Sequence, residues 1–375
     1  MKLSSAASLA LVFTASIVGC GSSDPEVSGA AGSSASAGNA GAPAAGSGGL
    51  SMNTAGAGQA GTSAGAAGAS AGTGGVAGSA GGASGGSAGS TAGGGGMGGA
   101  SAGAGGASFW GPGGPKKQWA CPAPPYAAQT KGPAVNICNS GGFKYNYGYN
   151  EGPTWIASQN AFFFSNFIQG SNLGGDIIKY PLNGTCEVWL HDVGCNGLGV
   201  SPSGNLLGAC HGPRAIMEYD MTTKVGRKVA TMVGGKDLDS PNDLIARSDG
   251  NVYFSNTTFE LGNRPPGLKE ALVRIDPKGV TSVIEAGGLN GVALSPDETK
   301  LYVVGKGTFM LDAAGAATKS NGPTPGGDGI AVDCAGTISN TGTNSAFGGP
   351  DGKTLIAVGG GTEAKTYQMT VPGLP

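Results

Sequence analysis

The chain has 375 residues, with 21 Lys and Arg residues, 23 Asp and Glu residues and a formal net charge of −2. It has no basic stripe and no basic residues interleaved with aromatic ones, which argues against nucleic acid as a partner. Gly, Ala and Ser fill one long segment near the N-terminus, so the chain divides into parts of different character.

The first segment, residues 1–19, has a single positive charge, Lys2, ahead of an apolar stretch. This is typical of a secretory signal and is too short for a spanning helix. The segment ends in IVGC, which resembles the lipobox of bacterial lipoproteins, so Cys20 would receive the lipid and become the mature N-terminus. The alternative is an ordinary cleaved signal followed by an incidental cysteine. We expect an exported bacterial lipoprotein, held to a membrane only by its lipid, in the periplasm or at the cell surface.

Residues 20–108 form the second segment and consist almost entirely of Gly, Ala and Ser after Cys20. Asp24 and Glu26 are its only charged residues. Such a composition buries too little apolar surface to offset the entropy of ordering the chain, so a disordered linker is predicted. A Gly-rich coil of this length has an end-to-end distance of about 50 Å.

Residues 109–375 are expected to form one domain with a substantial core. Apart from Cys20, this part holds all the cysteines of the chain, and their even number in an exported protein allows disulfides. We expect Cys121 to pair with Cys138 as a clasp on the segment that leads into the domain. No pair has CxxC spacing, so structural zinc is not expected. The six cysteines are Cys121, Cys138, Cys186, Cys195, Cys210 and Cys334.

A repeated pattern organises this domain, as in LNGVALSPDETKLYVV at residues 289–304. A polar residue precedes a short strand of alternating apolar residues, a turn and a second apolar strand, which is a strong hairpin signal. The first five repeats start 45, 46, 48 and 38 residues apart, a period typical of propeller blades. An all-β propeller with six blades is therefore predicted. The repeats start at Glu151, Asn196, Asn242, Asn290, Asp328 and Asn344.

These polar residues would meet at one point, because the innermost strands of a propeller surround a central channel. Amide and carboxylate oxygens gathered there suit a hard cation, Ca²⁺ before Mg²⁺. With only His191 and His211 in the chain, a zinc cage rich in nitrogen or sulfur is not available. The alternative is that Asn and Asp before a strand are turn residues that hydrogen-bond their own backbone.

At these positions the chain resembles the senescence-marker-protein/gluconolactonase-like family of six-bladed propellers, from about residue 145 to the end. Diisopropylfluorophosphatase is a more distant relative. The resemblance is carried by short stretches: Glu151-Gly-Pro-Thr-Trp155, Ser240-Pro-Asn242-Asp243 with Asp249-Gly250, Asn290-Gly291 through Ser295-Pro296-Asp297, Asp328-Gly329, and, near the C-terminus, residues 346–352 and Val371-Pro372-Gly373.

The resemblance implies a monomeric hydrolase of a small-molecule lactone such as glucono-1,5-lactone. Its cofactor would be a divalent metal, Ca²⁺ first, with Mg²⁺, Mn²⁺ and Zn²⁺ as alternatives. Asp328 would be the catalytic base, and Asn196, Asn242, His211 and Arg214 would contact the substrate. The metal ligands would be Glu151, Asn242, Asn290 and Asp328.

One departure from the family concerns the sixth repeat. Only 16 residues separate Asp328 from Asn344, so this blade is expected to lack two strands and to hold Asp328 poorly. Two other functions therefore stay open. One is a non-catalytic propeller that serves as a binding module at the cell surface, and the other is a phosphotriesterase-like hydrolase that uses the same metal site.

Overall fold

The structure is a computed structural model that describes residues 108–375, apart from residues 112, 113, 116, 118 and 140. The signal segment, the lipidation site Cys20 and residues 20–107 of the expected linker lie outside the described residues. Within the described part of the chain, no helix has the length and apolar character needed to cross a membrane.

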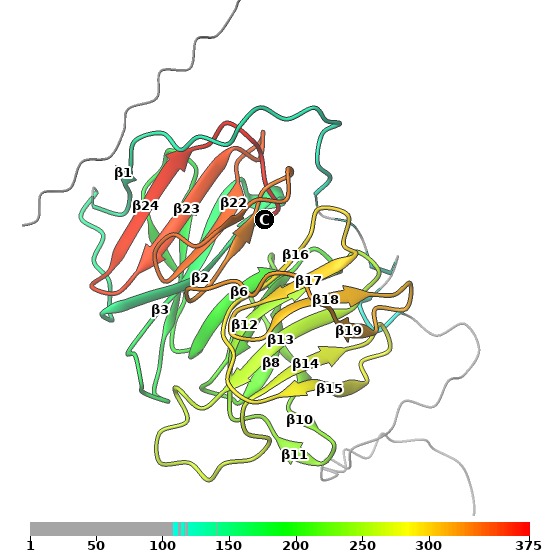
Figure 1. Cartoon of the computed structure of the whole chain (residues 1–375). Coiled ribbons are helices and arrows are strands. Elements are labelled where there is room, and N and C mark those ends of the chain that lie inside the picture. The colour runs from blue at the N-terminus through cyan, green and yellow to red at the C-terminus, as the bar shows by residue number, and fades with distance from the viewer. Residues whose placement is uncertain (1–107, 112–113, 116, 118, 140) are drawn as a thin grey trace, which may run out of the picture. The chain divides into compact units, whose positions relative to one another are not determined.

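Five four-stranded antiparallel sheets build the fold, and the chain completes them one after another (Figure 1). The first sheet comprises β2 (Tyr149–Ile156), β3 (Ala161–Phe167), β4 (Asp176–Pro181) and β5 (Glu187–Leu190), and the second comprises β6 (Cys195–Val200), β7 (Leu206–Cys210), β8 (Ala215–Tyr219) and β9 (Gly226–Ala230). The third comprises β12 (Ser240–Ala246), β13 (Val252–Thr257), β14 (Ala271–Ile275) and β15 (Thr281–Ala286). The fourth comprises β16 (Val292–Leu294), β17 (Lys300–Val303), β18 (Gly307–Leu311) and β19 (Ala317–Lys319). The fifth comprises β22 (Asn344–Gly348), β23 (Thr354–Gly359), β24 (Glu363–Gln368) and β1 (Val135–Asn136).

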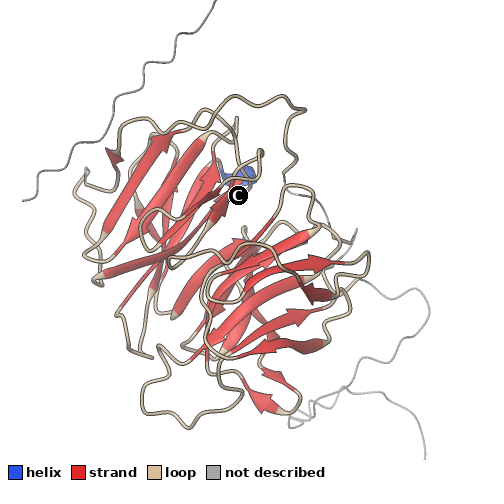
Figure 2. Ribbon diagram, viewed as in Figure 1, coloured by secondary structure: helices blue, strands red, loops and turns tan. Residues whose placement is uncertain are grey.

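Two smaller sheets complete the described strands. The hairpin of β10 (Met232–Val233) and β11 (Lys236–Asp237) precedes the third large sheet, and β20 (Ala331–Val332) pairs with β21 (Ile338–Ser339) after the fourth. Strands dominate the ribbon in Figure 2. Among the described residues there is no α-helix, and one 3₁₀ turn, η1, spans Ala157–Gln159.

The innermost strands contact one another in a closed ring. Strand β6 lies between β2 and β12, β16 lies between β12 and β20, and β22 lies between β20 and β2. The predicted all-β propeller is therefore confirmed. The structure has five four-stranded sheets where six blades were predicted, and the two-stranded sheet β20–β21 lies between the fourth and the fifth.

The backbone around Asp328 is fixed on both sides in spite of the short β20–β21 sheet. The Gly291 N–H donates to the carbonyl oxygen of Asp328 at 3.0 Å, and the Gly329 N–H donates to that of Thr343 at 2.6 Å. These bonds tie the residue to the stretches that lead into β16 and β22. The short sheet therefore does not leave the backbone at Asp328 without hydrogen bonds to its neighbours.

Residues from the start of the domain complete its last sheet. In β1, Val135 pairs with Thr366 and Asn136 pairs with Lys365 of β24. A strand that precedes the first sheet in sequence is thus the outer strand of the fifth sheet. This pairing joins the two ends of the domain and closes the ring.

Each large sheet buries both faces against its neighbours, as β3 illustrates. Successive side chains of a strand point to opposite faces, and β3 (AFFFSNF) is buried along its whole length. Phe162 and Phe164 pack in a cluster with Ile356 of the fifth sheet, whereas Phe163 packs in another with Leu206 of the second. This explains the continuous aromatic run, because neither face of the strand meets solvent.

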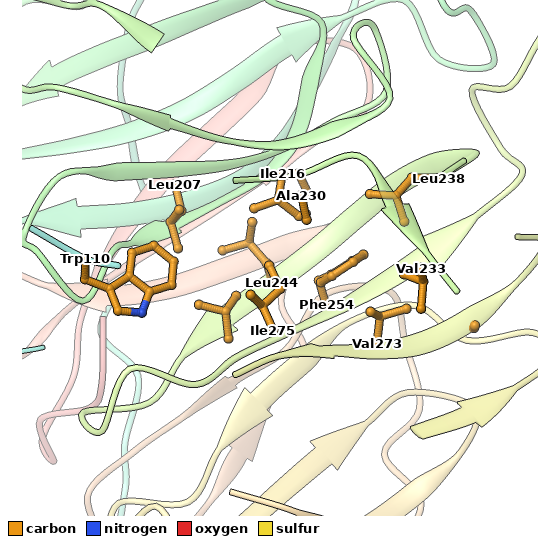
Figure 3. Close-up of a cluster of buried hydrophobic side chains, with 13 residues drawn as sticks. Trp110, Leu207, Ile216, Ala230, Val233, Leu238, Leu244, Phe254, Val273 and Ile275 are labelled. Atoms are coloured by element: carbon orange, nitrogen blue, oxygen red, sulfur yellow. The ribbon is translucent and has the colours of Figure 1, made fainter. Parts of the chain in front are cut away.

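Trp110 anchors the segment that precedes the propeller. Its side chain is 1% exposed and lies in a cluster built by the second and third large sheets, with Leu207, Leu244 and Ile275 (Figure 3). The indole Nε1–H donates to the carbonyl oxygen of Gly250 at 2.8 Å. The core therefore includes a residue close to the boundary that the sequence indicated for the linker.

The predicted pairing of Cys121 with Cys138 is wrong. Between these two cysteines the chain runs along the outer edge of the fifth sheet, where Val135 pairs with Thr366. This segment separates the two cysteines, and each pairs with a cysteine from another part of the fold. The disulfides are Cys121–Cys334, Cys138–Cys186 and Cys195–Cys210.

Candidate functional site

A cavity of about 380 Å³ lies at the end of the ring where the innermost strands begin. Five residues that the sequence singled out line it. Asn344 lines a different, inner cavity of the ring. The five are Glu151 on β2, Asn196 on β6, Asn242 on β12, and Asn290 and Asp328 just before β16 and β20. The other lining residues are Tyr149, Gln169, Gly170, Phe259 and Glu260.

Three of the innermost strands carry a β-bulge at the residue that faces this cavity. A bulge adds a residue to one strand and re-aims the side chains beside it. The register against the second strand shifts within Glu151–Thr154 of β2, Cys195–Leu198 of β6 and Pro241–Leu244 of β12. These three repeats therefore share the same backbone irregularity as well as the same type of polar residue.

The glycine that follows four of these residues is required by close approach of the strands. A Cβ atom on Gly197 would lie 2.5 Å from the carbonyl oxygen of Asn242, and one on Gly291 would lie 2.4 Å from that of Asp328. Contacts this short exclude any side chain. The Asn-Gly pairs thus combine a polar residue that lines the cavity with a residue that lets the next strand pack against it.

Asp243 stands where the third repeat would have this glycine. Its carboxylate is buried and accepts hydrogen bonds from the backbone N–H groups of Leu244 and Val292, both at 3.0 Å. Burial raises the pKa of Asp243 to about 7, although both hydrogen bonds oppose the shift. The side chain therefore links β12 to β16 beneath the cavity.

Three carboxyl groups line the cavity, those of Glu151, Asp328 and Glu260, and the first two belong to the repeated pattern. Glu151 is 4% exposed, and burial, followed by the negative charge of Asp328, raises its pKa to about 8. Burial also raises the pKa of Asp328, and a hydrogen bond from the Asn290 amide partly offsets this. No Lys or Arg is among the residues that line the cavity. The site is therefore short of positive charge.

The donor set fits a hard divalent cation. Glu151 and Asp328 supply carboxylate oxygens, and Asn196, Asn242 and Asn290 supply amide oxygens, the ligand types that Ca²⁺ and Mg²⁺ prefer. Among the described residues that line the cavity there is no His or Cys, so these donors do not suit zinc. Among the described residues, His, Cys, Asp and Glu alone form no group of three arranged to hold a metal. Holding a cation here would therefore require the amides.

His211 and Arg214 are not among the residues that line the cavity. The His211 side chain is fully buried, with its ring centroid 5.1 Å from that of Phe167. Arg214 forms an ion pair with Asp239 at 2.9 Å and donates to the carbonyl oxygen of Pro265 at 3.2 Å. Both positions are explained by the packing of loops, and their predicted contact with substrate stays a prediction.

Glu260 is the main polar residue of the cavity that the sequence did not indicate. It is 3% exposed, and its carboxylate accepts a hydrogen bond from the Ser240 hydroxyl at 2.9 Å. Burial raises its pKa, to which the charge of Asp328 adds. It lies in the loop after β13, outside the repeated pattern. A single buried acid in a loop gives no periodic signal, and the same holds for Tyr149, Gln169 and Phe259.

The fold and the cavity together define a class of protein. It is a β-propeller whose innermost strands present carboxylate and amide oxygens to one cavity. Residues 149–355 match the SMP-30/gluconolactonase/LRE-like region. The chain belongs to that family.

Known relatives agree with this assignment. The chain is 37% identical over 172 residues to the gluconolactonase of Zymomonas mobilis, a match that covers 41% of this chain and 48% of the relative. It thus spans about half the length of that protein. A gluconolactonase of Xanthomonas campestris has the same fold, with a TM-score of 0.53, 23% identity and coverage of 67% of this chain and 100% of the other. A further X-ray structure from the gluconolactonase family gives a TM-score of 0.56 and 23% identity, and the match covers 67% of this chain and 96% of the other.

Proposed function

We propose that the protein hydrolyses a sugar lactone, with glucono-1,5-lactone as the test substrate, and that it requires a divalent cation, Ca²⁺ before Mg²⁺. The observation that carries this proposal is the meeting of Glu151 and Asp328 with three asparagine amides in one cavity. Family membership and the similarity to a gluconolactonase support the choice of reaction.

Four residues would hold the cation: Glu151, Asn242, Asn290 and Asp328. Bound there, the cation would stabilise the negative charge that develops on the lactone carbonyl oxygen and acidify nearby water. It would also offset the mutual repulsion of the two carboxylates, whose pKa values are raised in its absence. The asparagine amides add oxygens without adding charge.

Asp328 would act as the general base. Its carboxylate takes a proton from a water molecule as the water oxygen attacks the lactone carbonyl carbon. The bond between this carbon and the ring oxygen then breaks, and the proton passes to the ring oxygen, which becomes a hydroxyl group. The products are the open-chain hydroxy acid and the unchanged protein.

The remaining polar residues of the cavity would orient the substrate. The Glu260 carboxylate can accept hydrogen bonds from substrate hydroxyl groups, and the amides of Asn196 and Gln169 can donate to or accept from them. Tyr149 and Phe259 offer ring faces to the C–H groups of a sugar ring. A polyhydroxylated lactone thus finds both kinds of partner.

We also propose how the domain is completed and held in the cell. The two-stranded sheet β20–β21 would be a shortened sixth blade, since it lies between β16 and β22 in the ring of innermost strands. Cys20 would carry a lipid, and residues 20–108 would tether a monomeric propeller to a membrane in the periplasm or at the cell surface.

The test is acid release from glucono-1,5-lactone by the full-length protein, corrected for spontaneous hydrolysis, with Ca²⁺ and with EDTA. Calcium-dependent release that disappears in Glu151→Gln supports the proposal, because this variant loses one negative oxygen ligand with little change in shape. Absence of release, with calcium still raising the Tm, would instead identify a non-catalytic binding module.

A further inference from the structure

Three large hydrophobic side chains are exposed on two loops beside the cavity. Ile168 (49% exposed) and Leu173 (69%) lie between β3 and β4, and Phe259 (48%) lies between β13 and β14. We call these three side chains the apolar rim. The other exposed large hydrophobic side chains of the described residues lie on the third or fourth strands of the large sheets, counted from the ring, or on the turns beside them: Val135, Val225, Val280, Val283 and Met310.

The two loops meet at the mouth of the cavity. Phe259 itself lines the cavity, as do Gln169 and Gly170, which directly follow Ile168. The backbone N–H of Gly170 lies close enough to the Glu260 carboxylate to oppose the rise in its pKa. Further along, a Cβ atom on Gly262 would lie 3.1 Å from the side chain of Asn172. The apolar rim thus belongs to loops joined by contacts next to the cavity.

The cavity and the apolar rim differ sharply in character. The inner part presents carboxylate and amide groups, whereas the rim exposes aliphatic and aromatic carbon to water. An exposed phenyl ring that lines a binding cavity gains free energy when a ligand covers it. A hydroxylated lactone ring alone satisfies the inner groups but offers little apolar surface to the rim.

We infer that the substrate is a hydroxylated lactone that also carries an apolar substituent, alkyl or aryl, which packs on Phe259, Ile168 and Leu173 while the lactone ring lies at Glu151 and Asp328. This rests on the proposed lactone hydrolysis. The polar cavity determines the reacting group, and the apolar rim determines which lactones are preferred.

The test is a series of δ-lactones with zero to six carbons in an alkyl chain on the ring carbon next to the ring oxygen. A methylene that is fully buried contributes about 0.8 kcal/mol, which is about a fourfold effect. Half burial on the apolar rim gives about twofold per methylene, so kcat/KM of the full-length protein should rise about twofold for each added carbon. In Phe259→Ser this dependence should largely disappear, whereas the control Met310→Ser, an exposed residue on β18, should retain it.

Binding of the corresponding alkyl δ-lactams, measured by calorimetry, separates this inference from the proposed function. Their ring amides resist hydrolysis, so their affinity reports the rim even if glucono-1,5-lactone is not turned over. Affinity that rises with chain length in the wild type and not in Phe259→Ser supports the inference. Equal affinity along the series, or an unchanged dependence in Phe259→Ser, overturns it and leaves the rim as a contact surface for a membrane or a protein.

Discussion

Acid should destabilise this protein through His211. The side chain is fully buried, and neither ring nitrogen has a hydrogen-bond partner among the residues that the structure describes. Burial, and then the nearby positive charge of Arg264, lowers its pKa to about 4. In the unfolded chain the pKa returns to about 6.5. Between these values the unfolded state binds a proton that the folded state does not.

The sign and size of the effect follow from this difference. Stability rises with pH wherever the unfolded state binds more protons, so the free energy of unfolding falls as the pH drops from 6.5 towards 4. The two pKa values give a loss of about 2 kcal/mol at pH 5 and about 3 kcal/mol below pH 4. Above pH 6.5 His211 is mostly neutral in both the folded and the unfolded state, so its titration no longer lowers the free energy of unfolding.

The perturbation is His211→Leu, which keeps a side chain of similar size beside Phe167 and removes the titrating group. Guanidinium denaturation in EDTA, followed by tryptophan fluorescence at pH 7 and pH 5, measures the free energy of unfolding. Carboxyl groups titrate in the same range, so the comparison between proteins isolates the histidine. The wild type should lose about 2 kcal/mol more than the variant.

The control is His191→Gln, because His191 is the other histidine of the chain and its side chain is 68% exposed. It should behave as the wild type does. An equal loss of stability in the wild type and in His211→Leu would show that His211 does not cause the acid sensitivity. His211→Leu also tests the predicted substrate contact. Replacing a residue that contacts the substrate would lower kcat/KM at least tenfold, whereas replacing a residue that only packs would leave kcat/KM nearly unchanged.

Three further predictions concern stability and substrate binding. Trp110→Ala should lower the free energy of unfolding by about 3–5 kcal/mol and the Tm, read by circular dichroism, by about 10 °C; a Tm within 2–3 °C of the wild type would show that this segment does not hold the core together. Cys121→Ser opens the Cys121–Cys334 disulfide, whose cysteines are 213 residues apart, and should cost up to about 5 kcal/mol in denaturant titrations, whereas an unchanged midpoint would contradict the pairing. Glu260→Gln should lower kcat/KM for glucono-1,5-lactone about tenfold relative to δ-valerolactone, which lacks hydroxyl groups; an equal fall for both would remove Glu260 from hydroxyl recognition.

The repeated pattern was readable in the sequence because it depends on short-range features. Alternating apolar residues, turns and polar residues at a regular period identified the innermost strands, including those at Asn196 and Asn242. The asparagines of the Asn-Gly pairs line the cavity. Their glycines are fixed by contacts with the next strand, as between Gly197 and Asn242, and such contacts are not visible in the sequence.

The disulfides show where such reasoning fails. Cys121 and Cys138 are neighbours in sequence, yet the chain between them follows the edge of the fifth sheet and separates them. Cys121 meets Cys334 because the segment before the propeller returns to the end of the domain. Sequence distance gives no measure of such a contact, since it depends on how the ring closes.

The all-β class, the propeller and the oxygen-bearing residues at the start of the innermost strands could be predicted from the amino-acid order, because each follows from local alternation and a regular period. The loops that border the cavity could not. Glu260 and Phe259 lie at the cavity, and His211 is buried outside the residues that line it. These positions result from packing between different sheets, which leaves no periodic trace in the chain.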